Sequence, residues 1–386
     1  MKSFTFCILL AHVLAFPLFA QKNAAITLNL AKAITQSPKT VMLSELASDV
    51  RYFPLETTDN CLLGNECSIV YAGNSIIAGD AQTRSFYRFD KNGKFMNKIG
   101  QHGQGPEEYA VGLLFFTDPD NQKLYVQDFQ DLICYDFNGK FIRRMPAPHL
   151  NMGTGAVSSG ESILYCDNNY FIRKDNPQQL FLIDGNGKKL KSWKGYIEPG
   201  KKYGINLSTR DVMYLHGGSV YFKPALENLV YKIDADRKKT LAWKLDCSGK
   251  DVDVSANEID PAKRFKSIAV QQVFESDRYF FVLYVLKNES FVGLYDRQKK
   301  SFSNVIIKDD LAAGFDFTPP GTGLGNQLAN ARMVGYLSKG KRYSKALLPE
   351  RKKELDELIN RLDEEDNPVM VVVTLKKNLY KFFLNV

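Results

Sequence analysis

Short apolar runs that end in an acidic residue and a polar turn dominate the hydrophobic pattern of this chain. Three copies carry the turn Asp-x-Asn-Gly, starting at Asp90, Asp136 and Asp184, and degraded copies start at Asp234 and Asp296. Asp and Asn side chains hydrogen-bond to their own backbone, and Gly accepts a positive φ, so such a segment closes a tight hairpin. Each copy therefore predicts two antiparallel strands joined by a short turn.

These acidic positions recur with spacings of 46, 48, 50 and 62 residues. A spacing of about 45 residues suits four short strands with their turns, which make one blade of a β-propeller. A further strand candidate, rich in β-branched and aromatic residues, precedes each copy. These candidates are too short, and too closely flanked by Gly and Asp, to be buried helices. They span residues 75–80, 123–128, 162–166, 219–223 and 278–284.

A sixth blade is predicted from the two ends of the chain. Residues 369–375 and 379–384 form a hairpin pattern, and 50–56 can supply a strand that closes the ring. Such closure removes exposed sheet edges, and Pro54 suits an edge strand because proline has no N–H to donate. The predicted fold is all-β: a six-bladed β-propeller of four-stranded antiparallel blades over residues 41–386, with the N-terminal strand closing the last blade.

One segment has helical rather than strand periodicity. Residues 346–366 place leucines at helical spacing among dense charges, and Pro349 suits a first helical turn. We predict one helical insertion in the last blade, packed on one rim as a structural flap. A partner-binding helix is the alternative.

The first twenty residues have the pattern of a secretory signal peptide. Lys2 gives the positive start, residues 4–16 are mostly apolar, and cleavage is expected after Ala20. Residues 21–40 then form an N-terminal extension. No later segment reaches about 18 uninterrupted apolar residues, so no mature transmembrane helix is expected. The sequence predicts export to the periplasm, the cell surface or the extracellular space.

Composition and charge narrow the partner classes. The net charge of +8 is spread thinly, and the short basic clusters 188–189 and 237–239 fall at predicted turns. Solvated hairpin tips explain them, whereas a nucleic-acid or anionic-glycan patch would need clustering on one face. No nucleic-acid partner is expected. Five cysteines follow the signal peptide. Cys61 and Cys67 lie close enough in sequence for a disulfide, but the sequence does not decide whether they form one.

The joint between the first two blades resembles a known family. Residues 89–95 (Phe-Asp-Lys-Asn-Gly-Lys-Phe) run into 99–109, which contains Ile-Gly-Gln-His-Gly-Gln-Gly-Pro-Glu-Glu-Tyr. This resembles the exported six-bladed β-propeller family with NHL-type repeats in Bacteroidetes-type bacteria. Residues 50–58 are similar to its opening strand. The resemblance implies a fold and a compartment but no substrate.

Candidate chemistry is sparse in this sequence. The glycines 100, 103 and 105 lack the spacing and βαβ context of a dinucleotide-binding loop and predict an inter-blade turn. Asp80, Asp128, Asp90 and Asp136 recur at blade positions, where a turn requirement explains them. The alternative is that they ring the channel and hold a cation or serve as an acid/base pair. No G-x-S-x-G, H-E-x-x-H or P-loop motif is present.

Two function classes remain. The main prediction is a binding or scaffolding module without cofactor, which takes a protein or glycan at one face of the disc, with Tyr109, Tyr196 and Tyr203 as candidate binding residues. The alternative is an NHL-type lyase or hydrolase with a divalent metal ion in the central channel. Its ligands would be the loop histidines His102, His149 and His216.

Overall fold

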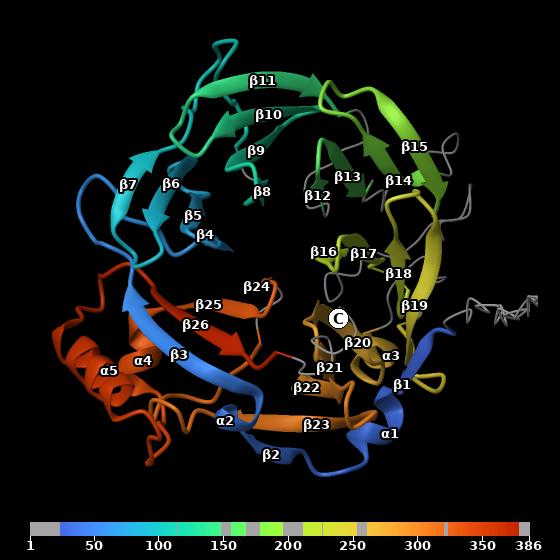
Figure 1. Cartoon of the computed structure of the whole chain (residues 1–386), viewed down its shortest axis with the longest axis vertical. Helices are drawn as coiled ribbons and strands as arrows, with labels where there is room; N and C mark the ends of the chain where they lie inside the picture. Colours follow the sequence, from blue (N-terminus) through green and yellow to red (C-terminus); the bar gives the residue numbers. More distant parts are fainter. Residues whose placement is uncertain are drawn as a thin grey trace, which may run out of the picture.

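The computed structural model shows six small sheets arranged as blades around a central channel (Figure 1). It describes residues 24–112, 114–147, 156–166, 178–195, 211–225, 227–252, 261–319 and 323–377, and every structural statement below concerns these residues. In each blade the first strand lies beside the channel and the fourth lies toward the outside of the ring. The predicted six-bladed β-propeller is confirmed.

The first three blades are consecutive antiparallel meanders. Blade 1 contains β4 (Cys67–Ala72), β5 (Ser75–Asp80), β6 (Ser85–Asp90) and β7 (Phe95–Lys98). Blade 2 contains β8 (Phe115–Asp118), β9 (Lys123–Asp128), β10 (Asp131–Asp136) and β11 (Phe141–Pro146). Blade 3 contains β12 (Ala156–Ser159), β13 (Ser162–Cys166), β14 (Gln178–Ile183) and β15 (Lys189–Lys194).

Blades 4 and 5 each gain a fifth, outermost strand from the N-terminal extension. Blade 4 contains β16 (Val212–His216), β17 (Ser219–Lys223), β18 (Leu229–Ile233) and β19 (Lys239–Asp246), with β1 (Ile26–Asn29) parallel to β19. Blade 5 contains β20 (Ala269–Glu275), β21 (Tyr279–Leu286), β22 (Glu289–Asp296) and β23 (Ser301–Lys308), with β2 (Lys39–Met42) parallel to β23. The short helices are α1 (Leu30–Ile34), α2 (Leu43–Leu46) and α3 (Pro261–Phe265). The sequence did not predict β1 and β2.

Blade 6 joins the two ends of the chain, as predicted. It contains β24 (Gly323–Leu324), β25 (Gln327–Arg332), β26 (Val369–Leu375) and β3 (Ala47–Pro54). β3 pairs antiparallel with β26, from Val369 opposite Pro54 to Leu375 opposite Ala47. The predicted hairpin partner of β26, residues 379–384, lies outside the described residues. In the described part of the chain, β25 and β3 occupy the two edges of β26.

The helical insertion lies between β25 and β26. Its main helix, α5 (Pro349–Arg361), begins at the predicted proline and buries Leu355 and Leu358. Arg351 of α5 donates to both carboxylate oxygens of Asp49 in β3, at 2.9 and 3.1 Å. The insertion also contains α4 (Val334–Lys339), which the sequence did not predict. Both helices lie outside blade 6 (Figure 1).

The recurring aspartates form turns, as their spacing predicted. The Oδ1 atom of Asp90 accepts the amide N–H groups of Asn92 and Lys94, and Gly93 has a φ of 89°. Asp184 makes the same bonds to Asn186 and Lys188. In the degraded copy of blade 4, Arg237 occupies the glycine position with a φ of 61°. The turn geometry thus survives the loss of glycine.

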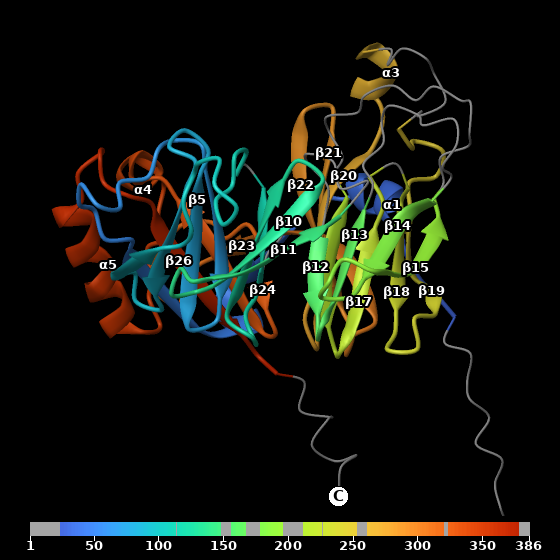
Figure 2. The same cartoon turned by 90° about the horizontal axis from the view of Figure 1, so that it is seen from above.

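Antiparallel pairing fixes which turns share a face of the disc. The turn between the first and second strands of a blade and the turn between its third and fourth strands lie at the same end. We call this end the Asp-turn face; the opposite face carries the second-to-third-strand turns and the inter-blade connections. In Figure 2 the turn between β18 and β19 lies at the bottom, whereas α3, from an inter-blade connection, lies at the top.

Apolar and aromatic side chains fill the spaces between blades. Trp243 of blade 4, for example, stacks on Phe280 of blade 5 with ring centroids 4.1 Å apart, and both are buried. Within the described ranges no helix has the length and apolar character that a membrane crossing requires.

Candidate functional site

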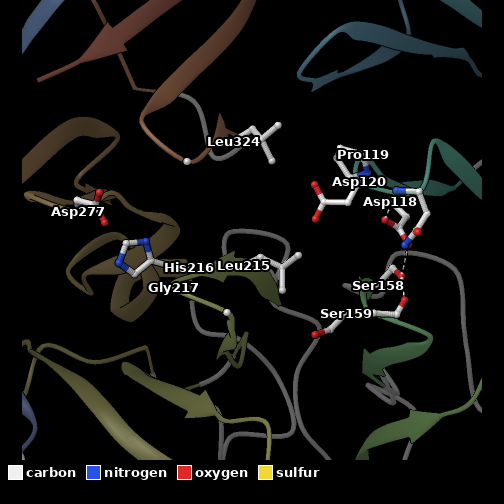
Figure 3. Close-up of a pocket in the computed structure, with 14 residues that line it drawn as sticks. Asp118, Pro119, Asp120, Ser158, Ser159, Leu215, His216, Gly217, Asp277 and Leu324 are labelled. Carbon is white, nitrogen blue, oxygen red and sulfur yellow. Dashed lines mark hydrogen bonds between the residues drawn. The ribbon is translucent and has the colours of Figure 1, made fainter. Parts of the chain in front are cut away.

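The mouth of the channel on the Asp-turn face is a cavity of about 430 Å³. Turns between first and second strands of five blades line it (Figure 3). Asp118, Asp120 and Ser158 reach it from one side, and His216 and Asp277 from the other (Figure 3). Five blades therefore form this cavity together, and no single blade forms it alone.

The channel mouth is acidic, and its lining side chains form hydrogen bonds with one another. Asp118 is buried and accepts hydrogen bonds from Ser158 Oγ at 2.9 Å and from Asn121 Nδ2 at 2.9 Å. Asp120 is exposed and Asp277 is half-buried, so two further carboxylates face the opening. Within the described part of the chain, no group of three or more His, Cys, Asp or Glu side chains has an arrangement that could hold a metal ion.

Glu275 lies between this mouth and a second cavity. Its side chain is 2% exposed; it forms an ion pair with Arg297 and accepts the Tyr214 hydroxyl at 2.8 Å. His216 Nε2 lies 3.9 Å from the same Glu275 oxygen that Arg297 contacts. Burial raises the pKa of Tyr214 well above its usual value, so its hydroxyl stays a donor to the carboxylate. A buried network thus connects the two cavities.

The second cavity is a groove of about 780 Å³ between blades 4 and 5. The Arg297 guanidinium lies over the Trp243 ring at 4.8 Å, and Tyr221 stacks on Tyr214 at 5.2 Å. Burial lowers the pKa of Arg297, but guanidinium groups remain protonated in proteins. We call this cavity the blade 4–5 groove. Its lining is Ala24, Ile26, Tyr221, Lys232, Lys238, Thr240, Leu241, Ala242, Trp243, Glu275 and Arg297.

Exposed cations surround both cavities on the Asp-turn face. In every blade the segment that follows the third strand carries at least one exposed lysine or arginine, whereas the turn aspartates are bound by backbone amides. We call this set the basic rim. Its members are Lys91, Lys94, Lys140, Lys188, Lys189, Arg237, Lys238, Lys299, Lys300, Lys376 and Lys377.

The basic rim is densest between blades 3 and 4. Lys191 Nζ of blade 3 donates to the Arg237 carbonyl oxygen of blade 4 at 2.5 Å, which brings the two hairpin tips together. Lys191 and Arg237 are 46 positions apart in the sequence. Their contact places the basic clusters 188–189 and 237–239 next to each other on one face. The two tips also contain the exposed carboxylate of Asp236.

The comparison with known families fits this architecture. The model described as Domain of unknown function (DUF4934) matches residues 25–374, a span that includes all six blades. The chain belongs to the DUF4934 family. No curated protein matches it.

Solved structures resemble the DUF4934 protein in fold. A protein of Bacteroides fragilis that is named as exported has a TM-score of 0.69 and 19% identity, over 92% of this chain and 100% of that chain. A DUF4221 family member from Bacteroides vulgatus has a TM-score of 0.50 and 11% identity, over 86% and 97%. At such identities the likeness shows the fold alone. It agrees with the resemblance to exported Bacteroidetes-type propellers that the sequence indicated.

Of the three tyrosines predicted to bind a ligand, Tyr109 is the one that the structure of the DUF4934 protein describes. Tyr109 is 1% exposed and packs edge-on against Phe86 and Tyr135, so its ring belongs to the core. This expectation is corrected: the inter-blade connection carrying Tyr109 folds its ring inward. Tyr196 and Tyr203 lie outside the described residues.

The two predicted channel histidines that the structure describes, His102 and His216, lie on different faces. His102 is exposed on the opposite face, where its Nε2 lies 3.2 Å from Arg84 Nη1 and 3.1 Å from the Ala110 carbonyl oxygen. His216 lines the channel mouth on the Asp-turn face. His149 lies outside the described residues. His102 and His216 cannot share a metal ion, because they lie at opposite ends of the blades.

Asp80 and Asp128 stabilise loops on the opposite face. Asp80 accepts the Gly64 amide at 3.0 Å and the Gln82 amide at 2.8 Å. Asp128 accepts the Ala110 and Val111 amides, both at 2.9 Å. These bonds are those of loop-forming aspartates. Cys61 and Cys67 are free thiols in this structure.

Sequence reasoning missed the residues that shape the groove, above all Glu275, Arg297 and Tyr221. Arg297 follows the aspartate of a degraded turn copy, and Glu275 ends an inner strand. From the sequence, their proximity could have been predicted only by assigning both residues to the Asp-turn end of their blades.

Proposed function

We propose that this DUF4934 protein is an exported binding module that holds an acidic polysaccharide on its Asp-turn face. The observation that carries the proposal is the basic rim: all six blades contribute an exposed cation to one face. The same face also carries the carboxylates of the channel mouth, but cations gathered along the rim attract an oppositely charged polymer there, and the attraction weakens as salt screens it.

The apolar surface favours a glycan over a protein partner. Protein interfaces usually contain a buried apolar or aromatic centre. Among the described residues, none of the large exposed hydrophobic side chains belongs to a third-to-fourth-strand turn, and Leu215, 41% exposed, is a single one that lines the channel mouth on this face. The most exposed of them, Phe129 at 69%, lies on the opposite face. A polyanionic glycan needs charges and hydrogen bonds more than an apolar centre.

Export is part of the proposal. The signal pattern over residues 1–20 lies outside the described residues, and the B. fragilis protein of the same fold is named as exported. A periplasmic or cell-surface location would bring the protein to acidic polysaccharides. The lyase or hydrolase alternative has less support, because His102 and His216 do not converge.

The test measures binding of polygalacturonate, with neutral dextran as the uncharged comparison. The mature chain is titrated at about 50 and 200 mM salt, between which an electrostatic complex weakens strongly. The rim variant is Lys188→Glu with Lys238→Glu. The matched control is Lys263→Glu with Lys266→Glu, which makes the same change in net charge on the opposite face.

We expect salt-sensitive binding of polygalacturonate, none of dextran, and a loss of about tenfold or more in affinity for the rim variant alone. Equal losses in the two variants would show that overall charge, not the face, governs binding. That result, or no binding at the lower salt concentration, would overturn the proposal. Capture of an acidic protein but not of the glycan would also overturn it.

A further inference from the structure

We infer that the blade 4–5 groove is a subsite for one carboxylate- or sulfate-bearing sugar unit, with Arg297 as its anion-binding group. The inference rests on the proposed function and gives it a location and a ligand chemistry. The groove lies within the Asp-turn face, since Lys238 and Arg297 belong to third-to-fourth-strand turns of adjacent blades.

Arg297 is held in place before any ligand arrives. Glu275 binds its guanidinium through Nη2, and the Trp243 ring lies against it at 4.8 Å. A planar guanidinium fixed in this way offers its remaining donors in a fork that matches carboxylate and sulfate oxygens. Its side chain is 27% exposed, so a ligand in the groove can reach it.

The accessible charge of the groove is positive. Glu275 contributes one negative charge, but its side chain is 2% exposed and already engaged by Arg297 and the Tyr214 hydroxyl. Lys238 is exposed and Lys232 is half-buried, and both line the groove. An anionic group in the groove therefore meets three cations and no accessible carboxylate among the lining residues.

The uncharged lining suits a sugar ring. Thr240 supplies a hydroxyl, and the Leu241 side chain is 38% exposed beside it. Sugars combine apolar C–H surfaces with hydroxyl groups, so a wall of mixed character complements them. The volume of about 780 Å³ lies within the range of small-ligand sites.

The channel mouth provides the contrast that directs the ligand. Asp118, Asp120 and Asp277 face that cavity, and like charges repel an anionic group. Both cavities open on the same face, with Glu275 between them. An anionic sugar on this face is therefore repelled from the channel and attracted to the groove.

The test uses short oligosaccharides, which span one groove but not the whole rim. Trigalacturonate supplies carboxylates without sulfate, a sulfated galactose disaccharide supplies sulfate without carboxylate, and galactotriose is the neutral comparison. Binding to the full mature chain is measured by calorimetry. The variants are Arg297→Lys, which keeps the charge but loses the fork, and Lys238→Ala, which removes an exposed cation.

We expect one anionic oligosaccharide per chain and no binding of galactotriose. Arg297→Lys should weaken binding about tenfold and Lys238→Ala about threefold. The control, Lys140→Ala on the rim of blade 2, should change it less than twofold. Preference between the two anionic probes tells carboxylate from sulfate. Thermal melts check that Arg297→Lys is folded, and Lys238→Ala tests the groove independently of its buried network.

The outcomes separate this inference from the proposed function. If long polygalacturonate binds but neither anionic oligosaccharide does, the face binds polymers and the groove subsite is wrong. If an oligosaccharide binds equally to wild type, Arg297→Lys and Lys238→Ala, the subsite is also wrong. If neither polymer nor oligosaccharide binds, both proposals fall.

Discussion

The two faces of the disc carry their charged residues in different ways. On the Asp-turn face, cations of the basic rim are exposed, and the turn aspartates are bound by amides of their own turns. On the opposite face, Lys223 has no exposed surface and donates to the carbonyl oxygens of Ala225 and Val270, at 3.3 and 3.2 Å. Burial lowers the pKa of that amine and nearby Asp211 partly opposes the shift, so that the pKa falls to about 8.

The same scaffold thus uses charge for different purposes at its two ends. The buried Lys223 on the opposite face connects blade 4 to blade 5 through its bonds to Ala225 and Val270, so its removal should cost stability. The exposed cations of the basic rim have few partners to lose, so their removal should cost binding. A variant on the opposite face that changes binding but not stability, or a rim variant that changes stability but not binding, would contradict this comparison.

The largest expected effect follows removal of the buried lysine. Lys223→Met leaves Asp211 without its counter-charge and two carbonyl groups without a donor, so we expect a loss of about 3–5 kcal/mol in the free energy of unfolding. Urea unfolding at pH 7 measures it. Lys238→Met on the Asp-turn face is the matched control and should cost less than about 0.5 kcal/mol. Equal losses would remove the distinction between the faces.

Asp211 gives a pH dependence with a defined sign. Burial raises its pKa from 3.8 to about 6, so between these values the folded protein binds the proton more tightly than the unfolded chain. The stability that this group contributes is complete below pH 3.8 and is lost as the pH rises through 6. The loss amounts to about 3 kcal/mol.

The Asp211→Asn variant isolates this contribution. Asn keeps the acceptor for the Ala225 amide, which Asp211 binds at 2.8 Å, but does not titrate. The stability of the variant relative to wild type should therefore rise between pH 4 and pH 7, measured by urea unfolding at each pH. A difference that is constant with pH would mean that Asp211 is not held in its protonated form at pH 4.

A smaller change in stability is expected at Arg237, which occupies a turn position that is glycine in blades 1 to 3. Arg237 has a φ of 61°, in the left-handed region where Gly93, Gly139 and Gly187 serve the other turns. Arg237→Gly should raise the free energy of unfolding by about 0.5–1 kcal/mol and weaken polygalacturonate binding. Lys238→Ala should weaken binding without raising stability. A stabilised Arg237→Gly variant with unchanged binding would separate the rim charge from function.

The sequence predicted the features that local turn chemistry encodes. The Asp-x-Asn-Gly turns, the strand around Pro54 and the helix starting at Pro349 follow from residues within a few positions of one another, and the blade period follows from the repetition of those turns. β1 and β2 were missed because each has four residues and pairs with a strand more than two hundred positions away. Nothing local distinguishes such strands from an extension.

The candidate site was harder to predict for the same reason. Tyr109, His102 and His216 were chosen by residue type, before the face to which each belongs was known. Whether these residues could form a site depends on which end of its blade each one occupies and on its burial. His102 and His216 lie on opposite faces, and the Tyr109 ring is buried. The blade 4–5 groove combines Tyr221, Glu275 and Arg297 from two sheets, a contact that no spacing in the sequence indicates.

The most direct test of the central claim is lysine acetylation footprinting of the mature protein with and without polygalacturonate. The account predicts slower acetylation of Lys91, Lys140, Lys188, Lys238 and Lys299 on the Asp-turn face, with Lys263 and Lys266 on the opposite face unchanged. Protection of Lys263 and Lys266, or no protection of the basic rim under conditions where the polymer is bound, would contradict it.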